Sequence, residues 1–311
     1  MTRRPLPDNR RRKTAAALLS VASNSALVAL KVVVGLAIGS VSVISEAIHS
    51  GLDLVAAIIA LLAVRHSGRP PDPRHPFGHG KIENISGAIE ALLIFLAAGW
   101  ILWEAVHKLR SPHQVATPIW GVAVMALSAV ANTLVSRLLL RVGRETESMA
   151  LQADAVHLST DVWTSLGVTG GLGLIWLGGL VRPGLDLHWL DPLAALVVAL
   201  LIGRAAWRLT LESARDLLDE SLPPVELAWI RDTVGALPHP VQGMHDLRTR
   251  KAGAHRFIEL HLEVDGAITV HASHAIADDL ERTVEARFPG AQALVHVDPF
   301  DDRIAPGGRG A

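Results

Sequence analysis

The chain contains no cysteine among its 311 residues, and charged residues make up only 19% of it. Without cysteine it has no disulfide framework and no thiolate metal site. Half of the residues are hydrophobic and the mean hydropathy is +0.34, which is unlike the composition of a soluble globular protein. Any transition-metal chemistry must therefore rest on the 15 histidines, helped by carboxylates.

Six long apolar segments each come near the roughly 20 residues that a helix needs to cross a bilayer. They cover about residues 14–38, 41–64, 82–106, 118–142, 148–178 and 187–207. Six such segments leave no polar face to meet water, which argues against a large soluble helical core. We therefore predict an all-α transmembrane domain of six helices over residues 14–207.

Lysine and arginine are unevenly distributed over the loops, and in membrane proteins the cytoplasmic loops carry the excess. The N-terminal tail and the loops after the second, fourth and sixth segments are basic, whereas the alternate loops are poor in basic residues. This distribution predicts that both termini are cytoplasmic, with residues 1–13 as a basic tail. Because the basic residues follow the membrane topology, they form no patch for nucleic acid.

The composition changes after residue 208, where charge returns and hydrophobic runs become short. The stretch HRFIELHLEV (255–264) alternates apolar and polar residues, as a half-buried strand does, and residues 244–253 resemble its hairpin partner. Helical patterns over about 223–236 and 270–288 flank this pair, and residues 293–299 form a last short strand. We predict a small cytoplasmic α+β domain, ordered α-β-β-α-β, over residues 208–300, and a disordered tail over 301–311.

Two membrane segments contain matching polar motifs. EAIHSGLDL (46–54) and DAVHLSTDV (154–162) each place a histidine four residues before an aspartate, so that both side chains share one helix face. An aspartate at mid-bilayer costs about 2.5–3.5 kcal/mol on insertion scales. If the two helices face each other, His49, Asp53, His157 and Asp161 converge into a four-coordinate site suited to Zn²⁺.

The twin motifs also permit alternatives to a transport site. The pairs could be structural hydrogen bonds between helices, or a proton relay without metal. An intramembrane zinc hydrolase would need three protein ligands, an open position for water and a general base, whereas this site has four ligands and the chain has no H-E-x-x-H motif. A zinc sensor would not need ligands inside the membrane.

Two further clusters of metal-ligand residues lie outside the membrane segments. The loop RPPDPRHPFGHGKIEN (69–84) contains Asp72, His75 and His79, and its prolines and glycines argue against a helix there. The predicted soluble domain places five candidates on or beside its strands and second helix: His245, His261, His274, His296 and Asp298. His296 and Asp298 are two residues apart and so share one face of a strand.

Taken together, the twin H-x₃-D motifs, the HPFGHGKIE loop and the HDLRTR…RFIELHLE…HVDP domain resemble the cation diffusion facilitator family, and most of all its bacterial zinc/proton antiporters. The resemblance covers about residues 14–299. It implies a homodimeric transporter of the inner (plasma) membrane, not an enzyme, with a metallochaperone-like C-terminal domain.

The resemblance also implies roles for individual residues. The transport site would be His49, Asp53, His157 and Asp161, and a loop site would be Asp72, His75 and His79, with Asp72 the least certain ligand because prolines flank it. The C-terminal site would be His245, His261, His274, His296 and Asp298. A salt bridge between Lys81 and Asp219 would lie near the cytoplasmic waist of the dimer.

The ligand chemistry agrees with Zn²⁺ as cargo. Two imidazoles and two carboxylates favour Zn²⁺ over Mg²⁺, Ca²⁺ or Mn²⁺, which prefer oxygen ligands. Fe²⁺, Co²⁺, Ni²⁺ and Cd²⁺ remain as alternative cargoes within the family. Because ligands must be deprotonated to bind metal, a site exposed alternately to each side would exchange Zn²⁺ for H⁺.

Overall fold

The computed structural model describes residues 7–37, 39, 41–110, 119–181 and 190–300. Contacts divide the chain into two compact units, one of residues 5–214 and one beginning at residue 215. Each unit is described by itself. The predicted N-terminal tail and the predicted disordered C-terminal tail lie largely or wholly outside the described residues.

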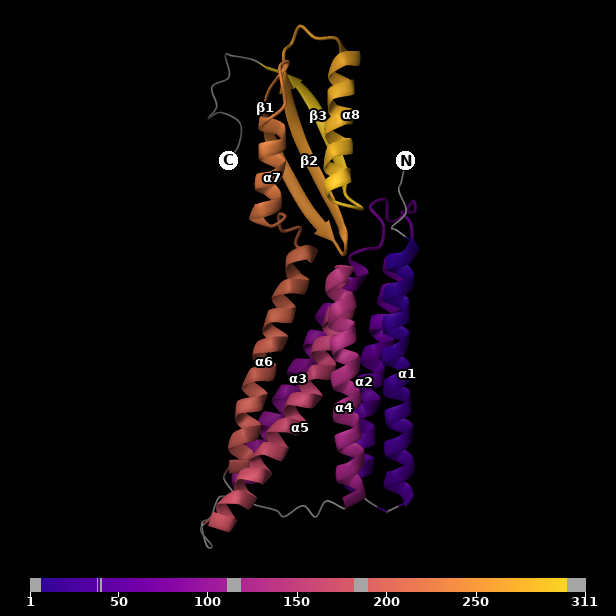
Figure 1. Ribbon diagram of the computed structural model, residues 1–311, viewed down its shortest axis with the longest axis vertical. Helices are drawn as coiled ribbons and strands as arrows, with labels where there is room; N and C mark the ends of the chain where they lie inside the picture. Colours follow the sequence, from indigo (N-terminus) through magenta and orange to yellow (C-terminus); the bar gives the residue numbers. More distant parts are fainter. Residues whose placement is uncertain (1–6, 38, 40, 111–118, 182–189, 301–311) are drawn as a thin grey trace. The chain divides into compact units, whose positions relative to one another are not determined.

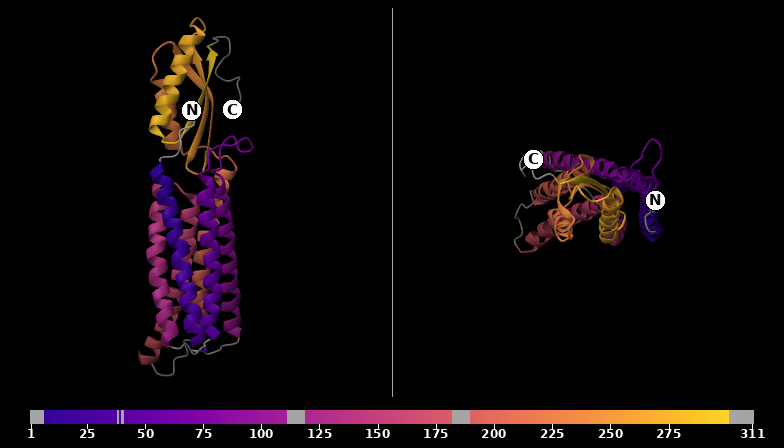
Figure 2. Two further views of the ribbon diagram at one scale, coloured as in Figure 1. Left: turned by 90° about the vertical axis from the view of Figure 1, so that its right-hand side faces the viewer. Right: turned by 90° about the horizontal axis from the view of Figure 1, so that it is seen from above.

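Six long helices build the first unit, as predicted (Figures 1 and 2). They are α1 (Pro7–Ala37), α2 (Val41–Ser67), α3 (Ile82–Arg110), α4 (Ile119–Glu145), α5 (Met149–Val181) and α6 (Leu190–Leu217). Helix α1 begins before the expected start near residue 14, and α6 continues past residue 208, because charged residues with good helix propensity extend both. Among the described residues, five helices are long and apolar enough to cross a membrane.

Small residues bring the helices of the bundle close together. Ala16 and Ala17 of α1 and Ala60 of α2 are buried against Leu139 of α4 and Leu151 of α5. A second cluster joins α3, α5 and α6 through buried alanines, isoleucines and other apolar residues. At Gly87 of α3 a Cβ atom would lie 2.6 Å from Ser213 Oγ of α6, so only glycine permits this approach. Large apolar side chains such as Leu96, Trp100 and Leu134 point outward, as lipid-facing residues do.

The second unit contains two helices and a three-stranded sheet (Figure 1). Its elements are α7 (Pro224–Gly235), β1 (Val241–Ala252), β2 (His255–Val264), α8 (Val270–Arg287) and β3 (Gln292–Pro299). Proline at the first turn opens α7, and the Thr269 hydroxyl accepts a hydrogen bond from the Ala272 amide (3.2 Å) to cap α8. The predicted α-β-β-α-β order is confirmed.

The central strand β2 separates an apolar face from a polar face. Its buried residues Ile258, Leu260 and Leu262 form the core with Ile230 of α7 and Leu280 of α8. Because side chains alternate along a strand, the residues between these core positions point to the opposite face of the sheet. That opposite face carries His261, which is paired with His245 of β1 and His296 of β3.

Candidate metal centres

The twin motifs meet inside the helical bundle, each histidine beside the aspartate of the other helix. His157 Nε2 of α5 lies 3.2 Å from Asp53 Oδ1 of α2. His49 Nε2 of α2 lies 3.7 Å from Asp161 Oδ1 of α5. Each histidine–aspartate contact therefore joins one residue of α2 to one residue of α5, so the site forms only where the two helices pack together.

This membrane site borders a cavity of about 60 Å³. Asp53 and His157 are buried, whereas His49 is half exposed into the open side of the site. One ligand atom from each of His49, Asp53 and Asp161 lies within 4.8 Å of the others. Ligand atoms around a tetrahedral zinc ion lie roughly 3.3 Å apart, so small side-chain movements would close this cluster around a metal.

The same cavity is lined by further polar residues that were not predicted as part of the site, among them Asn132 and Lys31. Asn132 of α4 donates a hydrogen bond from Nδ2 to Asp161 Oδ2 (3.3 Å), which orients that carboxylate. Lys31 of α1 is buried, donates to Ser50 Oγ (2.7 Å) and pairs with Glu46 Oε2 (3.1 Å). In the sequence, both are polar residues within apolar segments. This isolation is the feature that could have marked them as candidates for the site.

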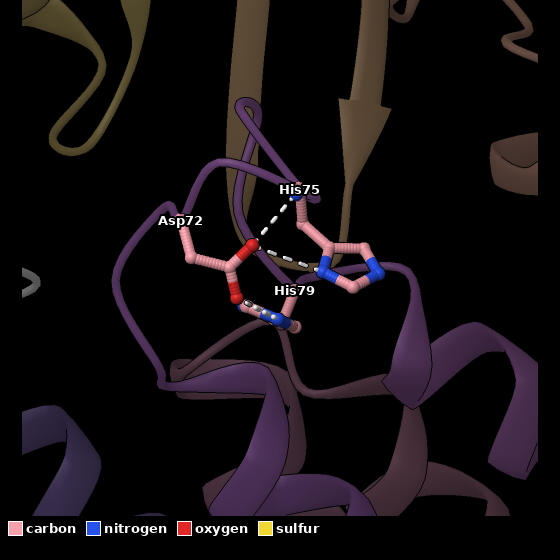
Figure 3. Close-up of side chains that lie close together, drawn as sticks. All are labelled: Asp72, His75 and His79. Carbon is pink, nitrogen blue, oxygen red and sulfur yellow. Dashed lines mark hydrogen bonds and ion pairs between the residues drawn. The ribbon is translucent and has the colours of Figure 1, made fainter.

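The loop between α2 and α3 gathers Asp72, His75 and His79 around one carboxylate (Figure 3). Asp72 Oδ1 lies 3.2 Å from His75 Nδ1, and Asp72 Oδ2 lies 3.3 Å from His79 Nε2. The two imidazole rings are 4.5 Å apart between centroids. The three predicted residues thus form a compact cluster with an exposed side, suited to a metal ion that enters from solvent.

Local backbone structure holds this loop cluster in place. The amides of His75 and Arg74 donate to Asp72 Oδ1 at 2.7 and 2.9 Å, and Asp72 and His75 exchange two backbone hydrogen bonds. The His75 amide is the main reason that the pKa of Asp72 falls below its ordinary value. The flanking prolines remove backbone donors but leave the Asp72 side chain at the centre of the turn.

The strand register of the C-terminal domain aligns three histidines. His245 of β1 pairs with His261 of β2, and His261 pairs with His296 of β3. Asp298 lies among them: its Oδ2 is 2.9 Å from His261 Nδ1 and 3.3 Å from His245 Nε2, and its Oδ1 is 3.3 Å from His296 Nε2. The sheet therefore brings four of the five predicted residues of this site together.

Electrostatics favour an ionised carboxylate at the centre of this C-terminal cluster. Partial burial raises the pKa of Asp298. The hydrogen bond with His261 and the charges of the neighbouring histidines lower it by more than burial raises it, so the pKa lies below its ordinary value. Glu263, which the sequence patterns did not predict, lies on the same face, with its Oε1 2.9 Å from His245 Nδ1. It is placed to orient that imidazole or to bind metal itself.

The remaining predicted residues lie apart from these clusters. His274 is exposed on α8, and its Nε2 is 3.7 Å from Asp278 of the same helix. Asp219 has an ion pair with Arg250 at 3.7 Å. Lys81 and Asp219 belong to different units, so the salt bridge between them stays a prediction.

Sequence comparisons match nearly the whole chain. The profile described as "Cation efflux transmembrane domain" matches residues 17–218, and the profile "Cation efflux protein, cytoplasmic domain" matches residues 222–300. An uncharacterized transporter of Synechocystis, sll1263, is 37% identical over 92% of this chain and 90% of its own length. The cation-efflux pump FieF of Serratia proteamaculans is 35% identical over 97% of both chains.

Solved structures similar to this chain cover its C-terminal part. A chain of the transporter CzrB in a zinc form is 41% identical and covers 28% of this chain and 98% of its own, with a TM-score of 0.26. The metal-bound C-terminal domain of the CzcD transporter from Thermotoga maritima is 26% identical and covers 25% of this chain and 94% of its own, with a TM-score of 0.23.

Proposed function

Because this chain belongs to the cation diffusion facilitator (cation efflux) family, whose members are membrane transporters and not enzymes, we propose that it exports Zn²⁺ from the cytoplasm in exchange for protons. The observation that carries the proposal is the crossed pairing of His49 with Asp161 and of His157 with Asp53. Two imidazole nitrogens and two carboxylates inside an apolar bundle are a ligand set for a divalent cation.

Zinc is the cargo that this ligand set favours. Ions such as Mg²⁺ and Mn²⁺ prefer sites built from oxygen ligands, whereas imidazole with carboxylate in a four-coordinate arrangement suits Zn²⁺. Affinity alone does not separate Zn²⁺ from Fe²⁺, Co²⁺, Ni²⁺ or Cd²⁺, since geometry and availability decide. Uptake of each ion into proteoliposomes, at equal free concentration, tests the choice. Fastest transport of Zn²⁺ supports it, and faster transport of Fe²⁺ would reassign the cargo.

The proposed orientation follows from the basic loops. Arg65 lies in the last turn of α2, and Arg69 and Arg74 follow that helix. Arg141 and Arg144 lie near the end of α4, at the end of the bundle where α1 begins. We assign this end to the cytoplasm of a bacterial inner membrane by the positive-inside rule. Export then means that the membrane site opens first to this end and afterwards to the other.

The two histidines of the membrane site are proposed to carry the exchanged protons. Both must be neutral to bind metal, so zinc binding expels any protons they hold. Replacing His49 and His157 together with asparagine is expected to remove the proton release that accompanies zinc binding. A pH indicator dye in weakly buffered detergent solution measures it. The variants Asp72→Ala and Asp298→Ala are included in all samples so that the other two clusters do not contribute. Unchanged proton release would assign proton coupling to other residues.

Lys31 is proposed to limit how tightly the membrane site holds its cargo. Its ammonium group lines the same cavity as His49, Asp53 and Asp161, and it repels a divalent cation bound there. Lys31→Met is therefore expected to tighten zinc binding by roughly tenfold and to lower the maximal transport rate, because release becomes slower. Glu46→Gln, which removes the partner of Lys31, is expected to weaken binding. Calorimetric titration tests both variants, and equal affinities for all three proteins would contradict this role.

The soluble unit is proposed to form the dimer and to regulate transport. A domain of this family with three aligned histidines and Asp298 offers a zinc site whose occupancy can favour one state of a homodimer. We also propose the predicted salt bridge between Lys81 and Asp219, near the cytoplasmic waist of the dimer. The double exchange Lys81→Asp with Asp219→Lys should restore the dimer that either single change weakens, as read by analytical ultracentrifugation. If the double exchange does not restore the dimer, Lys81 and Asp219 do not form this salt bridge.

A further inference from the structure

A basic groove lies between α1 and α2, at the end of the bundle where α1 begins and α2 ends. It has a volume of about 670 Å³. Its basic lining residues are Arg10, Arg11, Arg65, His66 and Arg69. The groove owes part of its shape to Gly68, because a Cβ atom there would lie 3.0 Å from Arg10 Nε. Five basic side chains from two helices thus face one space.

The arginines of this groove differ in their pairing from their neighbours on α1. Arg12 and Lys13, the neighbours of the groove residues on α1, pair with Glu145 and Glu83. By contrast, none of the four groove arginines has an ion pair among the side chains that the structure describes. All four are exposed. Four guanidinium groups in one groove concentrate positive charge, and a guanidinium pairs well with a phosphate or carboxylate supplied from outside the chain.

The deeper wall of the groove is apolar. Leu18 of α1 and Leu62 of α2 line it, and their exposed fractions are 43% and 48%. Both lie within segments apolar enough to span a membrane, further from the helix ends than the arginines. An anion free in solution would need only the arginines. A charged end next to an apolar wall matches a phospholipid, which presents a phosphate and an acyl chain in the same order.

We propose that this groove binds an anionic phospholipid, with the phosphate between the arginines and an acyl chain along Leu18 and Leu62. Basic pockets between transmembrane helices bind lipid headgroups in this way. A bound lipid would clamp the ends of α1 and α2 together. Because α2 carries His49 and Asp53, the lipid would also steady the helix that supplies half of the membrane site. The proposal does not depend on which ion is transported.

The test compares a groove variant with a variant of equal charge. The groove variant carries Arg10→Gln, Arg65→Gln and Arg69→Gln. The control carries Arg137→Gln, Arg141→Gln and Arg144→Gln, three exposed arginines of α4 near the same end of the bundle. Native mass spectrometry of delipidated full-length protein, titrated with dioleoylphosphatidylglycerol, measures the affinity for lipid. Each arginine near a membrane surface contributes roughly fivefold, so the groove variant should lose about a hundredfold in affinity.

Three outcomes decide the proposal. The control should keep nearly the affinity of the unchanged chain, and dioleoylphosphatidylcholine should bind neither strongly nor selectively. An equal loss in both variants would show a diffuse charge effect and overturn the groove as a site. Competition by inorganic phosphate at low millimolar concentration would show a site for a soluble anion instead of a lipid. Thermal unfolding in the presence of each lipid provides a second reading, in which only the groove variant should lose the stabilisation by phosphatidylglycerol.

Discussion

Replacing Asp53 or Asp161 with alanine is expected to lower zinc transport by more than roughly a hundredfold. Each carboxylate lies beside a histidine of the other helix, at 3.2 Å for Asp53 and 3.7 Å for Asp161. Removing either one takes a ligand from the site and leaves an unpaired imidazole in an apolar bundle. Initial rates of zinc uptake, with a fluorescent zinc indicator inside proteoliposomes, measure the loss.

Ser128 provides a matched control for these two variants. It lines the same cavity, but its hydroxyl donates to the backbone oxygen of Val124 on its own helix (2.9 Å). Ser128→Ala therefore removes a polar group from the cavity without removing a free ligand, and should keep most of the transport rate. A similar loss in all three variants would indicate damage to packing and not the loss of a metal site.

Replacing Asp298 with alanine is expected to weaken zinc binding by the C-terminal cluster about a hundredfold. This carboxylate lies within 3.3 Å of three imidazole rings, and its hydrogen bond with His261 and the neighbouring histidines lower its pKa. We therefore propose it both as a charged ligand and as the group that holds the histidines together. The domain should stay folded, because Asp298 lies on the face of the sheet opposite the core.

Zinc titration of the full chain, in a background that carries Asp53→Ala and Asp72→Ala, measures the C-terminal cluster alone. Asp279→Ala is the control, since it removes an equal charge from the exposed face of α8, where Asp279 has an ion pair with Arg282. Undiminished zinc binding by the Asp298 variant would transfer the site to other residues, with Glu263 as the first candidate.

Periodicity and length were sufficient to predict the helices and the halves of the membrane site. Residues four apart share a helix face, so His49 with Asp53 and His157 with Asp161 could be paired from the sequence. The crossed contacts could not, because they depend on which helices pack together and at what height. Lys31 and Asn132 were not predicted as part of the site, because the sequence does not show that α1 and α4 direct them into the same cavity.

In the soluble unit, too, single elements could be predicted from the sequence but the contacts between them could not. The alternation of HRFIELHLEV predicted β2, but the alignment of His245, His261 and His296 depends on the register of β1 and β3. The register includes an irregularity after His245, which no sequence pattern announces. Glu263 joins the cluster for the same reason. His274, predicted both from its place on the second helix of the domain and from the resemblance, lies on α8 beside Asp278, outside this cluster of the described residues.

Zinc flux under an imposed pH gradient tests the central claim most directly. Proteoliposomes that contain the unchanged chain, or the chain with Asp53→Ala and Asp161→Ala, are placed in a pH gradient, and zinc movement is followed with time. The account predicts zinc movement opposite to the flow of protons for the unchanged chain, and none above empty liposomes for the variant. Flux that survives both substitutions would contradict it, because the twin motifs would then be structural and the cargo would cross elsewhere.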